Sequence, residues 1–362
     1  MSCVSPLGSP REYEALPPER VRERAWAARR ALGGRAVVLV HHYQTDEVME
    51  FADFRGDSLE LSRVAAAQRD SQYIVFCGVD FMAESAAILA SGEQTVLMPA
   101  GDAPCPMAGM VDVESMAQAW AQLTGLWGSD GLVPLVYQNS SAAVKAFCGA
   151  HGGAVCTSSN AGPAVRWAMR GGRRALFVPD RYLATNSVIQ LGYPEDRVGL
   201  WNRKSGRLEA SVPVDDLVLV AWDGFCAVHR LFKVEDVRAI REQYPGIRVI
   251  VHPECTPEVV QASDDSGSTA YIVREVEKAP GGARFAIGTE WHLVNRLAND
   301  NPGKTVVPLR RSACATMART DIFNVCYVLE NLAAGKPVKI VTVAPEIARQ
   351  ARSALQRMLE IK

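Results

Sequence analysis

The feature that most constrains the fold is a repeated alternation of short apolar runs with helix-compatible segments. Each run is continuously apolar and rich in Val, Ile and Leu, as in AVVLVHHY at residues 36–43. Continuous apolar strands are buried on both faces, and strands that alternate with helices pair in parallel. The sequence therefore predicts an α/β fold in which helices cover both faces of parallel sheets.

This plan occurs three times along the chain. The strands that we expect are 36–43, 73–77 and 95–100, then 132–139, 175–179 and 217–222, and finally 247–254, 285–290 and 305–309. Three similar passes predict three three-layer α/β/α domains. We place them at residues 34–117, 118–228 and 229–314.

The two ends of the chain lie outside the repeated plan. Residues 1–18 are proline-rich and expected to be irregular, whereas the charged run 19–32 is helix-compatible and ends at a glycine pair. Residues 315–362 indicate helices with one strand at 337–343. We expect the N-terminal segment 1–33 and the C-terminal helices of 315–362 to pack on the first domain.

Charge and hydropathy exclude several classes of protein. The 39 Lys and Arg residues balance 40 Asp and Glu residues, for a net charge of −1, so no basic field marks a nucleic-acid partner. No apolar run reaches the roughly 18–20 residues that cross a bilayer. The N-terminal MSCVSPLGSPREYE lacks the apolar core of a signal peptide. We therefore expect a cytoplasmic protein with no membrane partner.

Three of the nine cysteines occupy corresponding places, each just after the last strand of its pass: Cys105, Cys226 and Cys314. Three thiolates from three domains would suit a [4Fe–4S] cluster with one iron left open as a Lewis acid. The alternative is three ordinary buried cysteines. Of the others, Cys255 follows a strand end and fits either interpretation, and four are expected in the core: Cys77, Cys148, Cys156 and Cys326.

Polar side chains end the first strand of each pass. His41 and Tyr43 share one face of their strand, and Tyr137 and Asn139 repeat that spacing in the second pass. His252 and Glu254 repeat it in the third, as a pair that could bind a carboxylate and move a proton. Ligands of open α/β sheets bind at the carboxyl ends of strands, so three facing ends predict one central site. Capping roles for the histidines are the alternative.

Several hydroxyl residues can be placed at helix starts, where free N–H groups attract anions. For any one of them, N-capping of the helix is the alternative. Taken together they favour an anionic substrate. The residues are Ser58, Ser158 or Ser159, Ser268 or Thr269, and Thr289.

These motifs, in this order from about residue 36 to about residue 335, are similar to those of the quinolinate synthase family. The matching segments are VHHY with GDSLE, FCGVDFMAE, CPMA, YQN with SSAAVKA, TSSNA, CAVH, HPEC, GST, GTE and CATM. The resemblance implies three pseudo-threefold-related domains around one central [4Fe–4S] cluster. It implies condensation of iminosuccinate (iminoaspartate) with dihydroxyacetone phosphate to quinolinate, phosphate and water, in NAD biosynthesis.

The resemblance also implies roles for particular residues. Cys105, Cys226 and Cys314 match the cluster ligands. Tyr43, His252 and Glu254 match the residues of binding and proton transfer. The positions that hold the iminosuccinate carboxylates are His41, Ser58, Tyr137, Asn139, Ser158 and Thr269.

The chain departs from its relatives in three places. His42 stands where relatives often have an aromatic or amide residue, and Ser312 and Ala313 leave no thiol pair before the third ligand. The slightly longer loop between Asn139 and Ser158 keeps Ser159 open as an alternative to Ser158.

Two other classes of function compete with this interpretation. One is a lyase, either metal-free or with zinc held by His41, His252 and Glu254. The other is a non-catalytic sensor of small acids, for which an intact set of three cysteines would be superfluous. Because iminosuccinate is unstable, the synthase interpretation also predicts transient contact with an aspartate-oxidising enzyme.

Overall fold

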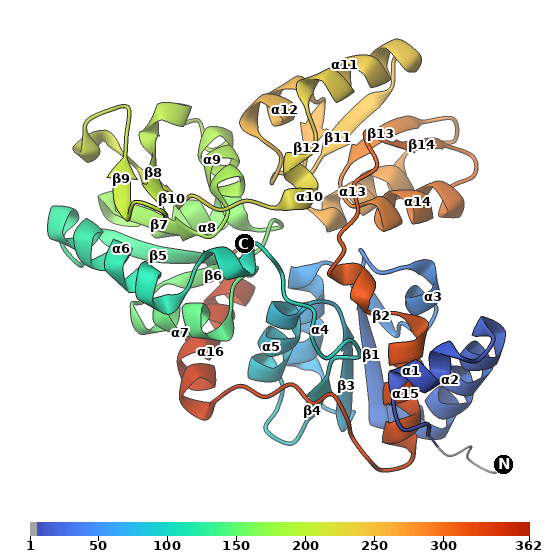
Figure 1. The fold of residues 1–362 in the computed structure, drawn as a ribbon. Helices are drawn as coiled ribbons and strands as arrows, with labels where there is room; N and C mark the ends of the chain where they lie inside the picture. The colour runs from blue at the N-terminus through green and yellow to red at the C-terminus, as the bar shows by residue number, and fades with distance from the viewer. Residues whose placement is uncertain (1–5) are drawn as a thin grey trace. The chain divides into compact units, whose positions relative to one another are not determined.

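The computed structural model describes residues 6–362 (Figure 1). Within these residues the strands form three sheets, parallel throughout except for one antiparallel pair, which confirms the predicted α/β class. The chain divides into two compact units. One runs up to Cys105 and includes Cys314–Ala344, and the other comprises Pro106–Ala313 and Pro345–Lys362.

The first unit holds a four-stranded sheet. Its order is β2 (Phe54–Gly56), β1 (Ala36–His41), β3 (Tyr73–Cys77) and β4 (Thr95–Leu97). One face packs in an apolar core with α2 (Pro18–Leu32) and α15 (Ile322–Ala333). The helices α4 (Ser58–Ala67) and α5 (Asp80–Leu89) lie on the other side of β1 and β3 (Figure 1). Short helices are α1 (Pro10–Glu14) and α3 (Asp46–Met49).

The second unit holds the other two sheets, of which the first has six strands. Its order is β6 (Ala154–Cys156), β5 (Leu132–Tyr137), β7 (Arg174–Val178), β10 (Leu219–Trp222), β8 (Val198–Asn202) and β9 (Arg207–Glu209). The antiparallel pair is β8 with β9. Around this sheet run α6 (Val113–Trp127), α7 (Ala142–Ala150), α8 (Ala161–Ala168) and α9 (Arg181–Gln190).

The last sheet has the order β12 (Asp265–Ser266), β11 (Arg248–Val251), β13 (Arg284–Gly288) and β14 (Thr305–Pro308). Its helices are α10 (Ala227–Arg230), α11 (Val234–Gln243), α12 (Pro257–Ala262), α13 (Thr269–Lys278) and α14 (Trp291–Asp300). In all three sheets the first strand lies between the second and the third. The strands fall within the predicted ranges 34–117, 118–228 and 229–314, although the domain boundaries themselves stay a prediction.

The final helix corrects one expectation about packing. Sequence analysis placed residues 345–362 on the first domain, but α16 (Pro345–Glu360) packs on α7 and β6 of the second unit (Figure 1). The helix buries one apolar stripe at i, i+3, i+4 and i+7, namely Ala351, Ala354, Leu355 and Met358. Gly149 permits the close approach, because a Cβ there would lie 2.0 Å from the carbonyl oxygen of Gln350.

Three other local predictions were wrong. The expected strand at 337–343 is an isolated bridge between Leu97 and Ile340, and part of the N-terminal segment forms α1. The strands β2, β6, β8, β9 and β12 were not predicted, because four of them have only two or three residues and β8 alternates half-buried and buried residues instead of forming a continuous apolar run. The four cysteines expected in the core are buried, and so is Cys255. Cys3 lies outside the described residues.

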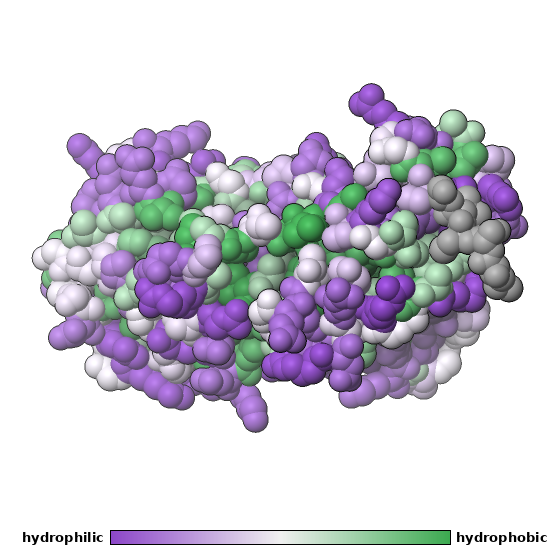
Figure 2. All heavy atoms as spheres, turned by 90° about the horizontal axis from the view of Figure 1, so that it is seen from below, coloured by the Kyte–Doolittle hydropathy of each residue, from purple (hydrophilic) through white to green (hydrophobic). Residues whose placement is uncertain are grey.

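The surface carries both hydrophilic and apolar side chains. Hydrophilic side chains cover much of the face in Figure 2, with apolar patches between them. Among the described residues no helix is long and apolar enough to cross a membrane.

A buried ion pair ties the N-terminal helices to α15 in the first unit. Glu330 accepts a hydrogen bond from the Tyr13 hydroxyl at 2.5 Å and pairs with Arg24 at 2.7 Å, with only 4% of the Glu330 side chain exposed. Glu330→Ala removes the carboxylate that pairs with the mostly buried Arg24 guanidinium, so we expect the free energy of unfolding to fall by about 3 kcal/mol. Urea denaturation followed by circular dichroism measures it. Glu23→Ala, which breaks an exposed pair, should cost less than about 1 kcal/mol. Equal losses in both variants would contradict this account.

Candidate active site

A connected polar cluster of the second unit lies where strands of its two sheets end. Tyr137 ends β5, Cys226 follows β10, Glu254 follows β11 and Thr289 follows β13. Since the carboxyl ends of parallel strands form the usual binding edge of an α/β sheet, this placement is that of a functional site.

Cys226 and His229 reach the cluster from one helical turn. Cys226 is the N-cap of α10, and His229 lies three residues later on the same face. The preceding loop passes close to the end of β7 at Gly224, where a Cβ would lie 2.3 Å from the Pro179 carbonyl oxygen. Only glycine permits this approach, which sets where α10 begins.

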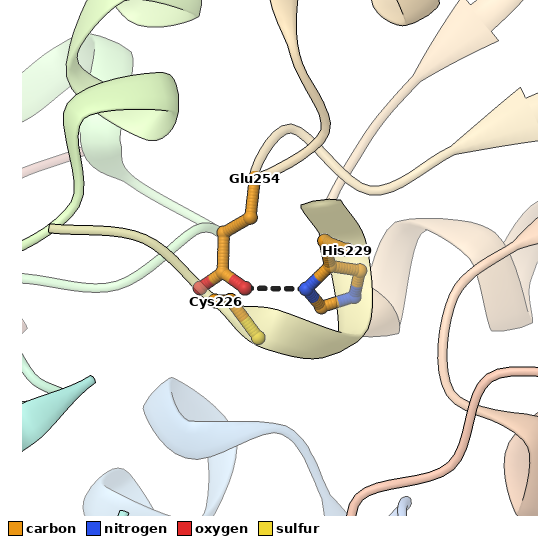
Figure 3. Close-up of side chains that lie close together, drawn as sticks. All are labelled: Cys226, His229 and Glu254. Carbon is orange, nitrogen blue, oxygen red and sulfur yellow. Dashed lines mark hydrogen bonds and ion pairs between the residues drawn. The ribbon is translucent and has the colours of Figure 1, made fainter. Parts of the chain in front are cut away.

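Glu254 is the centre of the hydrogen bonding. Its Oε2 lies 2.5 Å from His229 Nδ1, and the other ring nitrogen of His229 lies 3.1 Å from Thr289 Oγ1 (Figure 3). The His252 ring stacks on His229 with centroids 4.3 Å apart. Tyr137 makes a further hydrogen bond to the carboxylate. Because His229, His252 and Glu254 are each 2% exposed, these contacts are shielded from water and held in one geometry.

The surroundings of Glu254 and His252 lower the pKa of both side chains, which favours an ionised Glu254 and a neutral His252. Burial by itself raises the pKa of Glu254, but the charge of His229 and the hydrogen bonds from His229 and Tyr137 outweigh it and hold the pKa well below its usual range. Burial lowers the pKa of His252 to about 3, and the neighbouring His229 adds to the effect. At neutral pH the site therefore holds an ionised carboxylate, which can accept a proton or a hydrogen bond, beside a neutral imidazole, which can donate a hydrogen bond.

Asp180 adds a second buried carboxyl group. It caps α9 by accepting hydrogen bonds from the amides of Tyr182 and Leu183, both at 2.8 Å, and it is fully buried. Burial, followed by the charge of Glu254, raises the pKa of Asp180 well above its usual range. The two carboxyl groups therefore repel each other when both are ionised.

The buried His252 predicts acid sensitivity. Its folded pKa of about 3 lies below the roughly 6.5 of an unfolded histidine, so its stabilisation is complete above pH ~6.5 and falls by about 1.4 kcal/mol per pH unit below it. Glu254 adds a loss of the same sign at lower pH. His252→Gln should flatten the dependence between pH 6.5 and 4.5, measured by urea unfolding at each pH. The exposed His151→Gln should not, and an unchanged slope in His252→Gln would refute the assignment.

The predicted residues of the first unit form a smaller group at the end of β1. His41 Nδ1 accepts a hydrogen bond from the Tyr43 amide at 3.1 Å, and the two rings meet edge to face with centroids 4.7 Å apart. This contact confirms that His41 and Tyr43 share a face. Ser58 is the first residue of α4, which Asp57 and Glu60 cap reciprocally.

The remaining predicted substrate residues line strand and helix ends in the second unit. Thr269 begins α13, and Asn139 follows β5 with a buried Oδ1 that has no hydrogen-bond partner among the described residues. Ser158 is half-buried, whereas the Ser159 hydroxyl lies 2.8 Å from that of Ser268, the N-cap of α13. The Ser159–Ser268 bond links the two sheets of the unit.

Sequence reasoning brought Tyr137, His252 and Glu254 into one site but missed two of their neighbours. His229 was visible only as part of a Cys-x-x-His spacing, and Asp180 as a carboxylate that follows a strand and caps a helix. Thr289 was singled out as an anion site, whereas here it contacts a histidine.

The three cysteines of interest differ from the remaining described ones. Cys105, Cys226 and Cys314 are half-buried at the ends of the β4, β10 and β14 segments, and Cys314 Sγ lies 3.2 Å from Thr316 Oγ1. The other five are buried, and burial raises the pKa of Cys77 and Cys326 to about 12. Since thiolates rather than thiols bind metals, the three half-buried cysteines are a donor set that fits an iron–sulfur cluster.

Fold and site together define an α/β protein with a buried cluster of histidine and carboxyl side chains at the carboxyl ends of its strands. Residues 27–360 match the family model described as quinolinate synthetase A protein. Quinolinate synthases of Bacillus cereus and Halalkalibacterium halodurans are 42% and 44% identical over 97% of this chain and 96% of their own length. That of Anoxybacillus flavithermus is 44% identical over the same shares. The chain belongs to the quinolinate synthase family, which confirms the resemblance found in its motifs.

Proposed function

We propose that this protein condenses iminosuccinate with dihydroxyacetone phosphate, releasing quinolinate, phosphate and water for NAD biosynthesis. The observation that carries the proposal is the buried Glu254, ionised and held by His229 and Tyr137 beside a neutral His252, in a chain of this family. Condensation and the loss of water both require protons to be removed and delivered at fixed positions.

Cys105, Cys226 and Cys314 would hold a [4Fe–4S] cluster. Their equivalent places after the last parallel strand of each sheet, and their partial exposure, support this assignment. When bound, a cluster with three thiolate ligands supplies one iron with an open position, a Lewis acid toward a hydroxyl or carboxylate.

Glu254 acts as the base in this proposal. Its Oε2 is engaged by His229, whereas its buried Oε1 has no hydrogen-bond partner in the described part of the chain. Oε1 can therefore take a substrate proton without breaking the contact that holds the side chain. His252, neutral because it is buried, donates a hydrogen bond to a leaving oxygen atom, and Tyr43, packed against His41, donates the proton.

The remaining residues bind the carboxylates of iminosuccinate. Ser58 and Thr269 stand at the first position of α4 and α13, where free amides and the helix dipole favour anions. His41, Tyr137, Asn139 and Ser158 add donors at strand ends. The Nδ2 amide of Asn139 can donate to a substrate carboxylate, and its buried Oδ1 has no hydrogen-bond partner among the described residues and can accept from a substrate N–H or O–H.

The two serines of the TSSNA segment should behave differently. Ser158→Ala removes a proposed carboxylate donor, so we expect KM for iminosuccinate to rise about 5- to 10-fold, the value of one hydrogen bond of ~1 kcal/mol or slightly more. Ser159→Ala removes the bond to Ser268 and should change thermal stability more than KM. Steady-state kinetics under anaerobic conditions measure the first effect. A KM change confined to Ser159→Ala would reverse the assignment.

The test of the proposed function is an anaerobic assay. Protein purified without oxygen should carry about four irons and four sulfides and should convert iminosuccinate and dihydroxyacetone phosphate to quinolinate. A chain that is catalytically active with zinc and without iron would favour the lyase. A cluster-bearing chain that binds the acid without forming product would favour the sensor.

The cellular setting is part of the same proposal. The five buried thiols without disulfide partners are typical of a reducing compartment, so we place the reaction in the cytoplasm. Because iminosuccinate is short-lived in water, we propose transient contact with the aspartate-oxidising enzyme that supplies it. Faster quinolinate formation with that enzyme present than with the same flux of free iminosuccinate would support the contact, and equal rates would oppose it.

A further inference from the structure

Three different metal-binding groups meet beside Glu254. One donor atom each from Cys226, His229 and Glu254 lie within 4.8 Å of one another, and Figure 3 shows the three side chains turned toward a common point. A thiolate, an imidazole and a carboxylate are the ligands that Zn²⁺ takes in proteins, and three protein ligands leave a fourth position for water.

We propose that the cluster-free chain binds one Zn²⁺ through Cys226, His229 and Glu254, and that this ion keeps the iron–sulfur cluster off Cys226. The zinc site stands on the geometry of the second unit. The exclusion of the cluster rests in addition on the proposed function, since it requires Cys226 to be a cluster ligand.

His229 is held as a metal-binding histidine is usually held. A ligating histidine donates its second ring N–H to an oxygen, which fixes the tautomer and the ring plane. Here Nε2 faces Thr289 Oγ1 at 3.1 Å, and the stacked His252 ring fixes the plane from one side. With the imidazole proton on Nε2, the lone pair of Nδ1 points to the side where Glu254 lies.

Charge balance favours a dication. Zinc binding displaces the Cys226 thiol proton and the proton that His229 Nδ1 shares with Glu254, so thiolate and carboxylate together neutralise Zn²⁺, with a neutral imidazole as third ligand. The half-buried Cys226 leaves the site reachable from solvent.

Zinc binding requires only a small increase in the distance between His229 Nδ1 and Glu254 Oε2. His229 Nδ1 and Glu254 Oε2 are 2.5 Å apart, whereas two such ligands on one tetrahedral zinc lie about 3.3 Å apart, given zinc–ligand bonds of about 2.0–2.2 Å. Side-chain rotation supplies this separation, since both residues stand on short, local segments, a four-residue helix and a strand end.

Anaerobic titration of the iron-free full-length chain with Co²⁺ tests the site. One equivalent should produce thiolate-to-cobalt charge transfer and tetrahedral d–d absorption, and Zn²⁺ should abolish both. His229→Gln and Glu254→Gln should each weaken Zn²⁺ binding at least 100-fold, and Thr289→Val about 10- to 100-fold. Cys314→Ala is the matched control: it removes another proposed cluster ligand and should leave the titration unchanged. Circular dichroism checks that each variant is folded.

Two outcomes would overturn the zinc site. Unchanged affinity in both His229→Gln and Glu254→Gln would show that the metal lies elsewhere. Loss of binding in Cys314→Ala would place the metal on the cysteine set.

Cluster reconstitution with and without one equivalent of Zn²⁺ tests the exclusion. Zinc should reduce iron incorporation at least 10-fold in the wild-type chain but less than 2-fold in His229→Gln, and a chelator should restore it. Equal iron incorporation with and without zinc overturns the exclusion. If the zinc-free chain fails to take up iron, both the proposed cluster and its exclusion by zinc are overturned. The zinc site is then still tested separately by the Co²⁺ titration.

Discussion

Glu254→Gln is expected to lower kcat for quinolinate formation about 10²- to 10⁴-fold, the usual contribution of a positioned base. Glutamine keeps the shape of the side chain and an oxygen that can accept from His229, but it cannot take a proton. The loss should fall on kcat rather than on iron content, because no proposed cluster ligand changes. The measurement is the anaerobic steady-state rate, with iron and sulfide determined on the same sample.

Glu258→Gln is the matched control for this variant. Glu258 lies four residues further along the chain, is exposed, and stands in the first turn of α12. The same change of charge there should leave kcat within 2-fold of the wild type. A Glu254→Gln enzyme that turns over normally would remove Glu254 as the base and move that role to another group at the site.

The parts of the fold that sequence predicted are those that depend on burial of long apolar runs. Strands such as β1 and β5, buried along their whole length, carry a pattern that only a sheet covered on both faces explains. The two-residue β12 carries no such pattern. The apolar stripe of α16 was equally visible in the sequence. Such a stripe predicts that a helix packs on something, but not which sheet or helix it packs on, so the contact of α16 with α7 could not be predicted.

The same distinction applies to the site. His252 and Glu254 were predictable, because a polar pair that ends a buried strand stands at the binding edge of the sheet. His229 was not, since its contact with Glu254 joins residues 25 positions apart in sequence and depends on how the loop at Gly224 directs α10. Asp180 was missed for a related reason. Helix caps are common on strand-to-helix loops, and only the structure places this one beside Glu254.

Cys226 belongs to two different groups of residues. Along the chain it belongs to a set of three cysteines, each at the end of its sheet, whereas in space it stands beside His229 and Glu254. One histidine of the site, His229, and one proposed cluster ligand, Cys226, therefore stand on the same helical turn. A change in the position of α10 should affect both functions together, which is a reason to measure iron content in every variant of the site.

The largest effect of all is expected from the cysteine set. Cys105→Ala, Cys226→Ala and Cys314→Ala should each lose the cluster, with iron and sulfide falling from about four per chain to background and quinolinate formation falling to the limit of detection. With only three cysteine ligands, one iron of the cluster already lacks a protein ligand, so we expect the loss of any further ligand to abolish cluster binding. Because the three residues are only half-buried, their loss should leave the fold intact by circular dichroism.

Cys77→Ala and Cys156→Ala are the matched controls, because they make the same substitution at thiols that lie within strands and are fully buried. A protonated thiol packed in a core contributes volume and no ligand, so these variants should lose some stability while keeping iron and activity. If one of the three half-buried cysteines could be replaced without loss of iron, the cluster would have to take another ligand, and His229, three residues from Cys226, would be the first residue to test.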